Sequence, residues 1–329
     1  RAGIPSRFEY ENAATGDVND VAGTWEYSTN TFYAQYDVEA FDGLNMVFGL
    51  RYDEYDTSDT PPTNPLFEAD YGFTNANTLD GVSLLQPRFS ATYELNDDVI
   101  LRGGLGLYSG GNPAVWLTNS FVRTGGKTFG TRNSGLADGQ SLFDVPHSGA
   151  EDGQPNSAGY GIPTAAYDEV NSNLNQFSAN EDVNFLDPNF DMPSEWKLSI
   201  GSTHTLTDEI TANFDILVSR GNNALMVTRG DLDPVLDANG NQALTEQGFP
   251  DYVSNRIESY AVTNADEDAL SYTLSAAFAG EHDNGLSWSA GYAYTDAEDV
   301  QGLVSSQATS NYQRTARTDA QGQVASTSN

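Results

Sequence analysis

The sequence contains no cysteine, only three histidines and few basic residues, and each shortage excludes a class of protein. Without cysteine the fold uses no disulfide, no thiolate metal site and no cysteine nucleophile. The histidines, His147, His204 and His282, lie far apart, which argues against a histidine-rich zinc site. The 14 Lys and Arg residues against 47 Asp and Glu give a formal net charge of -33, which excludes the basic patch that nucleic acid or an anionic membrane surface requires.

Long apolar runs are missing as well. No run of about 18 apolar residues occurs, so the sequence predicts no transmembrane helix. No signal-peptide pattern opens the sequence, as is expected of a mature or partial chain. Neither a G-x-S-x-G elbow in a strand-turn-helix setting nor a G-x-x-x-x-G-K-[ST] loop is found, and the histidines are expected in loops or turns. We therefore predict that the chain is not an enzyme, needs no cofactor and binds no nucleotide.

Abundant aromatic residues and glycine, with 17 Tyr, 16 Phe and 31 Gly, favour an all-β protein. The clearest element is a hairpin at 31–53. Apolar residues recur at every second position from Phe32 to Ala40 and again from Leu44 to Tyr52, with mostly polar residues between them. Because side chains alternate across a strand, this pattern gives two faces, one apolar and one mostly polar, over roughly ten residues per strand. About 9–11 residues are what a tilted strand needs to cross a bilayer.

The same unit recurs along the chain. We expect four hairpins, at about 31–53, 88–108, 195–220 and 269–295, separated by long polar stretches that we interpret as loops, at 54–84, 109–193, 221–268 and 296–329. Within these stretches we expect a short helix around 113–121 and a small hairpin at 237–241. Short and very long connections thus alternate strictly, which is typical of a transmembrane β-barrel with short periplasmic turns and long external loops.

The fold class predicted is therefore an antiparallel transmembrane β-barrel of about eight strands, with a soluble β-sandwich as the alternative. Small hydrophilic residues on the polar face and aromatic residues near strand ends favour the barrel. Small barrels rarely carry a loop of about 85 residues between neighbouring strands. We therefore expect a segment of a larger barrel, with further strands on both sides. An open sheet edge is not tolerated in lipid.

Three stretches resemble one known family. GLGLYSGGNPAVWLTNSF (104–121), DPNFDMPSEWKLSIG (187–201) and SSQATSNY (305–312) resemble the barrel of TonB-dependent outer-membrane receptors, and most closely the Oar-like branch. The resemblance covers about 31–312. It implies outer-membrane lipid as surroundings, a 22-stranded barrel with an N-terminal plug, and energy supplied by the TonB complex. The sequence shows no plug domain and no TonB-box-like start, so it resembles a middle piece of such a receptor.

Two groups of residues are candidates for function. Candidate ligand-binding residues in the loops, for which packing against the barrel rim is the alternative, are Asn112, Trp116, Asn119, Phe121, Tyr160 and Tyr167. Charged residues expected on the lumen-facing side, where they pair with each other, with a plug or with substrate, are Arg51, Arg88, Arg102, Lys197 and Asp215. The acidic loop at 231–241 offers oxygen ligands for Ca²⁺, but its spacing fails the EF-hand pattern. We expect a solvated turn there and predict no metal site.

Two hypotheses of function remain open. In the first, the chain is part of an outer-membrane active transporter whose long acidic loops capture a scarce small-molecule, peptide or glycan nutrient, with a peptide or oligosaccharide favoured over a siderophore. In the second, it is a surface β-barrel that adheres to glycans, proteins or Ca²⁺ without transport. A plug encoded upstream favours the first hypothesis, and closure of the eight strands by themselves favours the second.

Overall fold

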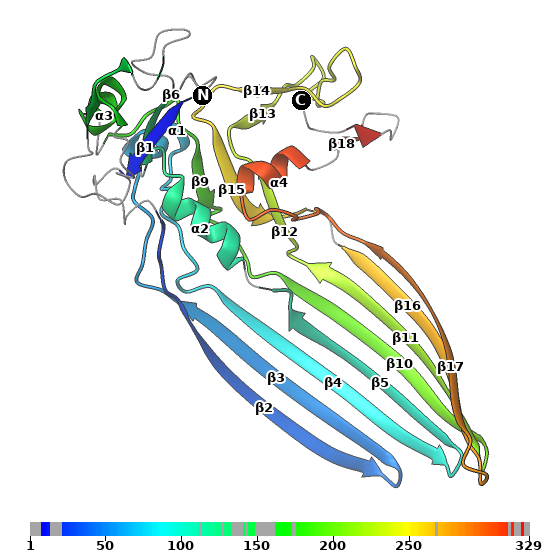
Figure 1. Ribbon diagram of the computed structural model, residues 1–329. Helices are drawn as coiled ribbons and strands as arrows, with labels where there is room; N and C mark the ends of the chain where they lie inside the picture. Colours follow the sequence, from blue (N-terminus) through cyan, green and yellow to red (C-terminus); the bar gives the residue numbers. More distant parts are fainter. Residues whose placement is uncertain are drawn as a thin grey trace.

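The computed structural model describes residues 8–13, 22–111, 113–126, 128–132, 141, 144–148, 162–172, 176–266, 269–314, 317–318 and 324–325. Figure 1 shows two regions: a sheet of long strands and, at one end of it, a group of short helices and strands that we call the cap. The described part contains no helix of the length and hydropathy needed to cross a membrane.

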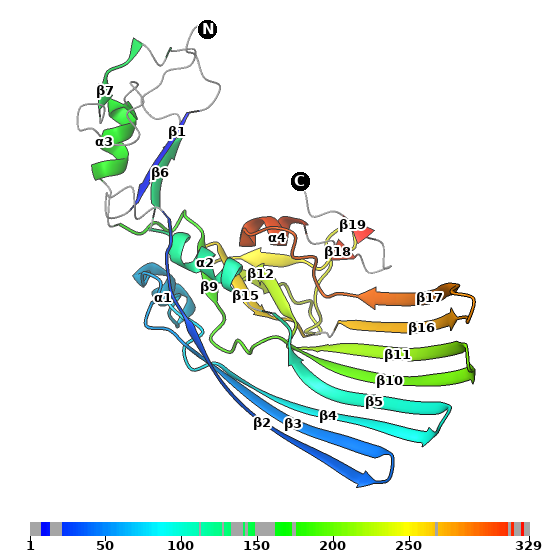
Figure 2. The ribbon, with the colours of Figure 1, turned by 60° about the horizontal axis from the view of Figure 1, so that its bottom comes forward.

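The sheet has eight antiparallel strands in the order β17-β16-β11-β10-β5-β4-β3-β2. Each strand therefore pairs with the strand of this sheet that comes before or after it in the sequence. It is curved and open, as one part of a barrel wall (Figure 2). The all-β antiparallel class is therefore confirmed. The strands are β2 (Ser28–Phe41), β3 (Leu44–Asp56), β4 (Ser83–Asn96), β5 (Val99–Ser109), β10 (Ser194–Thr207), β11 (Ile210–Asn222), β16 (Leu270–Glu281) and β17 (Ser287–Glu298).

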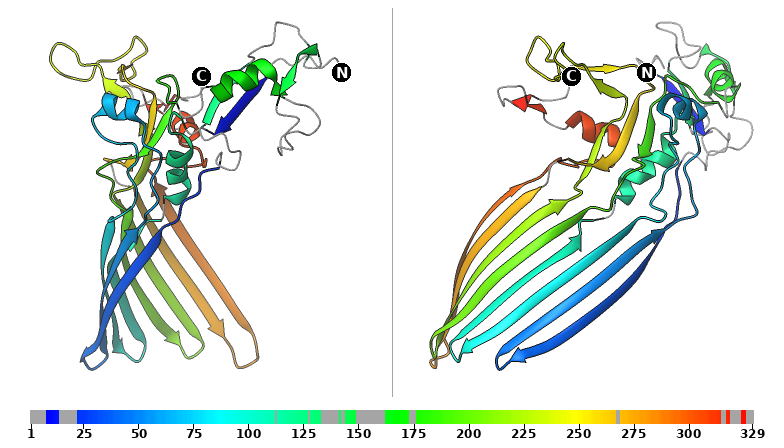
Figure 3. Two further views of the ribbon diagram at one scale, coloured as in Figure 1. Left: turned by 90° about the vertical axis from the view of Figure 1, so that its left-hand side faces the viewer. Right: turned by 180° about the vertical axis from the view of Figure 1, so that it is seen from behind.

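The strand register joins the apolar faces of all four hairpins into one surface. Phe89 lies opposite both Phe48 and Leu105, and Leu198 lies opposite Leu105 and Val218. These side chains are largely uncovered: Phe48 is 44% exposed and Leu105 is 47% exposed. The helices gather at the cap end and leave both faces of the sheet bare (Figure 3). A broad apolar surface of this kind marks a binding or membrane-contacting face.

Short turns close the hairpins at the end away from the cap. At the first of them Asp42 and Gly43 form the turn, and Gly43 has a φ of +79°, which an L residue adopts only at a cost. A Cβ on Gly43 would also lie 2.9 Å from the backbone oxygen of Glu94. The Gly43 carbonyl accepts a hydrogen bond from the Glu94 amide at 2.8 Å, so this turn ties the first hairpin to the second.

The long connections are not simple loops, and here the sequence interpretation was incomplete. They carry the helices α1 (Pro65–Tyr71), α2 (Ala114–Val122), α3 (Thr164–Ser172) and α4 (Ala308–Arg314), of which only α2 was expected. They also carry a second sheet of β12 (Leu225–Arg229), β15 (Ser259–Asn264) and β9 (Val183–Leu186), in that order. Smaller paired strands are β1 (Glu9–Ala13), β6 (Thr128–Arg132), β7 (His147–Ser148), β8 (Ile162–Pro163), β13 (Leu232–Pro234), β14 (Tyr252–Ser254), β18 (Arg317–Thr318) and β19 (Val324–Ala325).

One hydrophobic core holds the cap together. Its buried members come from all four long connections, for example Leu79, Leu186, Tyr260 and Ala308. A second cluster packs Phe67 of α1 between Val183 and Phe185 of β9 and the β15 region. The four connections therefore fold as one body, which fixes the positions of α2 and α4 relative to the sheet.

A buried ion pair fixes the chain where it leaves β12. Asp231 is fully buried and forms a two-point ion pair with Arg229. Its carboxylate also accepts hydrogen bonds from the Ser254 hydroxyl at 2.6 Å and the Ser259 amide at 3.3 Å. Burial raises the pKa of Asp231, but the bonds from Arg229 and Ser254 outweigh it and hold that pKa below its ordinary value.

We expect Asp231→Ala to destabilise the cap by about 3–5 kcal/mol, because it leaves the Arg229 guanidinium without its buried partner. The folded-state pKa is depressed, so the stabilisation by Asp231 is present above about pH 4 and is lost as pH falls through the folded value. Hydrogen exchange of the β12 and β15 amides measures this. The matched control is Asp233→Ala, which removes the half-exposed partner of Arg256 and costs below about 1 kcal/mol. Equal effects of the two substitutions would contradict the assignment.

Candidate functional site

The charged residues expected on the lumen side lie on the sheet face opposite the apolar surface. Arg51 pairs with Asp53 at 2.9 Å, Arg102 pairs with Asp215 at 2.7 Å, and Lys197 pairs with Glu195 at 3.0 Å. The Arg102–Asp215 pair lies over the backbone of Gly201, where a Cβ would collide with both side chains. We call this side the polar face. Three of its four predicted cations are therefore neutralised by carboxylates on the same face.

Arg88 is held differently, by an aromatic ring and an amide. Its guanidinium carbon lies 4.3 Å from the centre of the Tyr108 ring, and Nη2 donates to Gln86 Oε1 at 3.1 Å. The Lys197 ammonium lies 5.9 Å from the same ring centre. A Cβ on Gly106, between the two cations, would meet Tyr108 and Arg88 at 3.0–3.1 Å. Glycine at this position therefore leaves room for the stacked arginine.

The structure assigns Trp116, Asn119 and Phe121 packing contacts. Trp116 Nε1 donates to the backbone oxygen of Ser305 at 2.8 Å, and Asn119 Nδ2 donates to that of Ser306 at 2.8 Å. Phe121 is 7% exposed and stacks on Trp25 with 5.4 Å between ring centres. Trp116 and Asn119 thus fasten residues 299–307, which we call the strap, to α2. Both interpretations left open by the sequence remain, because Trp116 and Asn119 make these packing contacts and also line cavities of the cap.

Of the other candidate ligand-binding residues, the structure describes only Tyr167. Asn112 and Tyr160 lie outside the described residues. Tyr167 lies on α3 and stacks on Tyr10 at 6.2 Å between ring centres, and α3 packs against β1 and β6. Tyr167 thus belongs to the group of α3, β1 and β6, whereas Trp116, Asn119 and Phe121 lie on α2.

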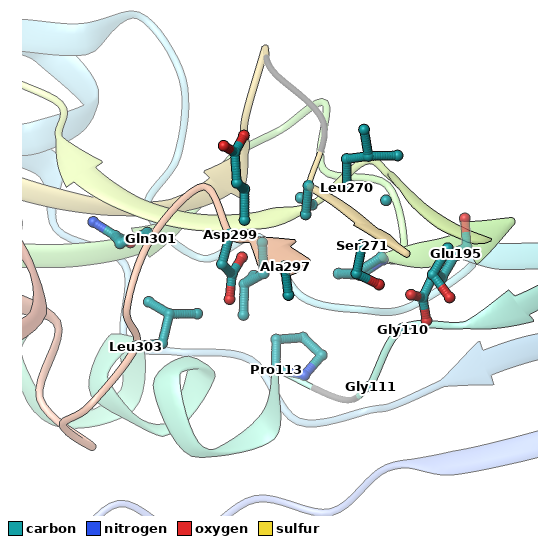
Figure 4. Close-up of a pocket in the computed structure, with 18 of the residues that line it drawn as sticks. Gly110, Gly111, Pro113, Glu195, Leu270, Ser271, Ala297, Asp299, Gln301 and Leu303 are labelled. Carbon is teal, nitrogen blue, oxygen red and sulfur yellow. The ribbon is translucent and has the colours of Figure 1, made fainter. Parts of the chain in front are cut away.

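A cavity of about 640 Å³ lies where the polar face meets the cap (Figure 4). Strand ends form one side of it, and α2 and the strap form the other. Gln301 fixes the strap by accepting from the Val227 amide at 2.7 Å and donating to the Val227 carbonyl at 3.0 Å, as a neighbouring β-strand would. The side chains that give the cavity its chemistry are Trp116, Glu195, Ser219, Leu225, Leu270, Ser271, Glu298, Asp299, Gln301 and Leu303.

The charge of this cavity is one-sided. Glu195, Glu298 and Asp299 line it, and no lysine or arginine is among its lining residues in the described part of the chain. Glu195 is paired with Lys197, while hydroxyls and leucine side chains supply the rest of the wall. Such a cavity repels anions and suits a polar ligand that is neutral or cationic. Sequence reasoning did not find these carboxylates, because Glu298 and Asp299 lie about a hundred positions from Glu195 and no motif connects them.

The acidic loop considered for Ca²⁺ forms a turn. Asp237 Oδ1 accepts hydrogen bonds from the amides of Asn239 at 2.8 Å and Asn241 at 2.9 Å. These bonds hold the pKa of Asp237 below its ordinary value. In the ranges that the structure describes, no three His, Cys, Asp or Glu residues gather in a metal-binding arrangement.

Comparison with known proteins gives a likeness at the level of overall fold. No protein-family model matches the chain, and no curated protein sequence matches it. Among solved structures it is similar to the siderophore receptor PirA from Acinetobacter baumannii, at a TM-score of 0.46 and 12% identity, covering 82% of this chain and 28% of that one. It is also similar to the outer membrane transporter YddB from Escherichia coli, at a TM-score of 0.43 and 10% identity, covering 82% of this chain and 25% of that one. A third similar structure is the FrpB iron transporter (F5-1 variant) from Neisseria meningitidis, at a TM-score of 0.41 and 13% identity, covering 86% of this chain and 29% of that one. The chain spans between a quarter and a third of the length of these proteins.

The contact between Trp116 and the strap gives a testable expectation. Trp116→Phe keeps an aromatic ring at this position but removes the hydrogen bond to Ser305. We therefore expect the free energy needed to open the strap to fall by about 0.5–1.5 kcal/mol. Hydrogen exchange of the Ser305 to Gln307 amides then accelerates by roughly two- to tenfold. Trp25→Phe is the matched control, because Trp25 Nε1 donates to Thr118 on α2 and not to the strap. Unchanged exchange in Trp116→Phe would show that the hydrogen bond does not hold the strap.

Proposed function

We propose that this chain is part of the barrel wall of an outer-membrane receptor, and that its cap captures a nutrient for active uptake energised by the TonB complex. The observation that carries this proposal is the continuous, exposed apolar surface on one face of the eight-stranded sheet. A soluble β-sandwich buries such a face against a second sheet. In the part of the chain that the structure describes, nothing covers it.

The dimensions of the strands support a membrane-spanning wall. The eight strands have 11 to 14 residues each, which is enough for a tilted strand to cross the hydrocarbon core. Short turns lie at one end and the cap lies at the other (Figure 1). This asymmetry matches a barrel whose long connections face the outside of the cell.

The two sheet edges support a larger assembly. Within the described ranges, β2 and β17 have a neighbour on one side only, and every residue of β17 is exposed. Unpaired backbone groups cost several kcal/mol each in lipid, roughly as in any water-free medium. Further strands that pair with β2 and β17 would remove this cost. We propose that they belong to the same barrel, together with a plug through which the TonB complex acts.

The cavity chemistry guides the proposed ligand. Three carboxylates around a space of about 640 Å³ disfavour an anionic ligand. A peptide or an oligosaccharide carries the neutral polar groups that the hydroxyls and the apolar wall can accommodate. We therefore propose one of these two classes, and not an anionic siderophore, as the captured nutrient.

The proposal is tested by two neighbouring residues on β11. Ile216 is 44% exposed on the apolar face, and Leu217 is 42% exposed on the polar face. We expect Ile216→Arg to destabilise the membrane-inserted form by about 2–4 kcal/mol, because it places a charge in lipid. Leu217→Arg should be nearly neutral, because its side chain faces the lumen. The measurement is the fraction of protein that reaches the outer membrane folded, judged by heat-modifiable migration in gels.

Two outcomes would overturn this function. Equal behaviour of the two arginine variants would contradict membrane insertion of the apolar face. Uptake of a radiolabelled peptide or oligosaccharide that is equally fast in cells with and without the TonB complex would contradict energised transport. In the latter case the membrane fold would stand and the chain would be part of a surface protein that does not transport.

A further inference from the structure

A second cavity, of about 500 Å³, lies further along α2 and the strap than the first. Its walls come from α2 and Arg123 after it, from Asp182 and the following strand β9, and from the end of the strap and the start of α4. Helix α2 packs directly on β9, so the two sides of the cavity are held by the cap core. The residues that line it are Val115, Thr118, Asn119, Val122, Arg123, Asp182, Asn184, Ser306, Gln307 and Thr309.

Asn184 lines this cavity and carries a buried, unsatisfied hydrogen-bond acceptor. The residue is 3% exposed, and its Oδ1 has no hydrogen-bond partner in the part of the chain that the structure describes. Its neighbours on β9, Val183 and Phe185, pack into the cluster around α1, which turns Asn184 toward α2 and the cavity. The backbone amide of Asn184 donates to the Arg123 carbonyl at 2.7 Å, so the residue is fixed in place. Buried side-chain carbonyls usually receive a donor, and a ligand bearing one would supply it here.

Asp182 adds a second acceptor on the same side of the strand. Burial raises the pKa of this carboxyl, and the nearby Arg123 guanidinium opposes the shift. In the described ranges the Asp182 side chain receives no hydrogen bond from another residue, and Arg123 forms no hydrogen bond or ion pair through its side chain. One desolvated carboxyl and one unused guanidinium therefore face the same space.

Asn119 completes the set of polar groups. Its Nδ2 is committed to the backbone oxygens of Val115, Trp116 and Ser306, which leaves Oδ1 as a further acceptor. The hydroxyls of Ser306 and Thr309 act as donor or acceptor. Val115 and Val122 provide an apolar strip on the helix. The cavity thus combines three acceptors, one cationic donor and a small apolar surface.

We propose that this cavity binds a neutral, hydroxyl-rich ligand of disaccharide size. Each sugar hydroxyl donates one hydrogen bond and accepts others, so it can satisfy Asn184 or Asp182 while it accepts from Arg123. The formal charges of Asp182 and Arg123 cancel. An isolated ammonium would be repelled by the arginine and a carboxylate by the aspartate. The volume lies within the range of about 300–1,000 Å³ typical of small-molecule sites.

This inference gives the substrate class of the proposed capture function and rests on that function only for its biological role. The binding is read on the purified, detergent-solubilised barrel of which this chain is proposed to be part, without membranes or uptake. Failure of sugar binding would not change the expected results for Ile216→Arg and Leu217→Arg, which test the barrel wall. Failure of that test would leave the cavity and its ligand class unaffected.

The experiment is calorimetric titration with three neutral disaccharides, maltose, cellobiose and lactose, and with the zwitterion glycylglycine. We expect at least one disaccharide to bind with a Kd in the millimolar range or tighter. Asn184→Leu, which removes the acceptor at similar volume, should weaken that binding at least tenfold. Asp182→Asn keeps an acceptor and should weaken it only several-fold.

Asn189→Leu is the matched control, since Asn189 is an exposed amide five positions further along and lies outside the cavity. It should bind like the unmodified chain, and thermal unfolding of both leucine variants verifies that they fold. If Asn184→Leu fails to fold, Arg123→Gln, at an exposed position, provides the test and should also weaken binding. Three results would each overturn the proposal: no binding of any disaccharide at 10 mM (roughly the weak limit of such sites), unchanged binding in the folded cavity variants, or tighter binding of glycylglycine.

Discussion

The period-two alternation of side chains, held in register across seven strand pairings, is the constraint on which the rest of the structure depends. In an antiparallel sheet a slip of one residue would turn a whole strand over and mix the two faces. Here the register keeps Phe48, Phe89 and Leu105 in one row across three strands. The opposite face keeps Arg102, Gly201 and Asp215 in another row. A wall with one apolar and one polar side exists because the hairpins keep this register along their length, with shifts only beside the turns of three of them.

The cap depends on the wall in turn. Its elements are short, and none would bury enough surface alone to form an independent core. They become stable because the sheet brings the four long connections to one end, where Leu79, Leu186 and Val227 meet in a single cluster. The Arg229–Asp231 pair and the contacts of Gln301 with Val227 then fix the chain paths around that cluster. The two cavities along the strap therefore have definite shapes, although much of their walls comes from connections and not from long strands.

The sequence predicted the wall well and the cap poorly, for physical reasons. Sustained alternation over ten or more residues identifies a strand with one buried or lipid-facing side. The strand Val183–Leu186 is buried on both sides and has only four residues, so it carries no alternation to detect. Helix α1 did leave a signal that was missed: Asn64 caps it with bonds to the Leu66 and Phe67 amides, and Pro65 opens its first turn. Trp116 was placed in the right helix, but its contact with Ser305, 189 residues away, has no trace in local sequence.

The distribution of charge links the wall to the two cavities. With a net charge of -33, the chain has few cations, and the polar face pairs three of them with carboxylates of its own. Little positive charge is therefore left near the rim, and the cavity bordered by Glu298 and Asp299 is acidic. In the second cavity Arg123 balances Asp182, so that cavity carries no net formal charge. The two cavities therefore disfavour anions for different reasons: the first through its excess of carboxylates, and the second because a charged group that suits Arg123 is repelled by Asp182.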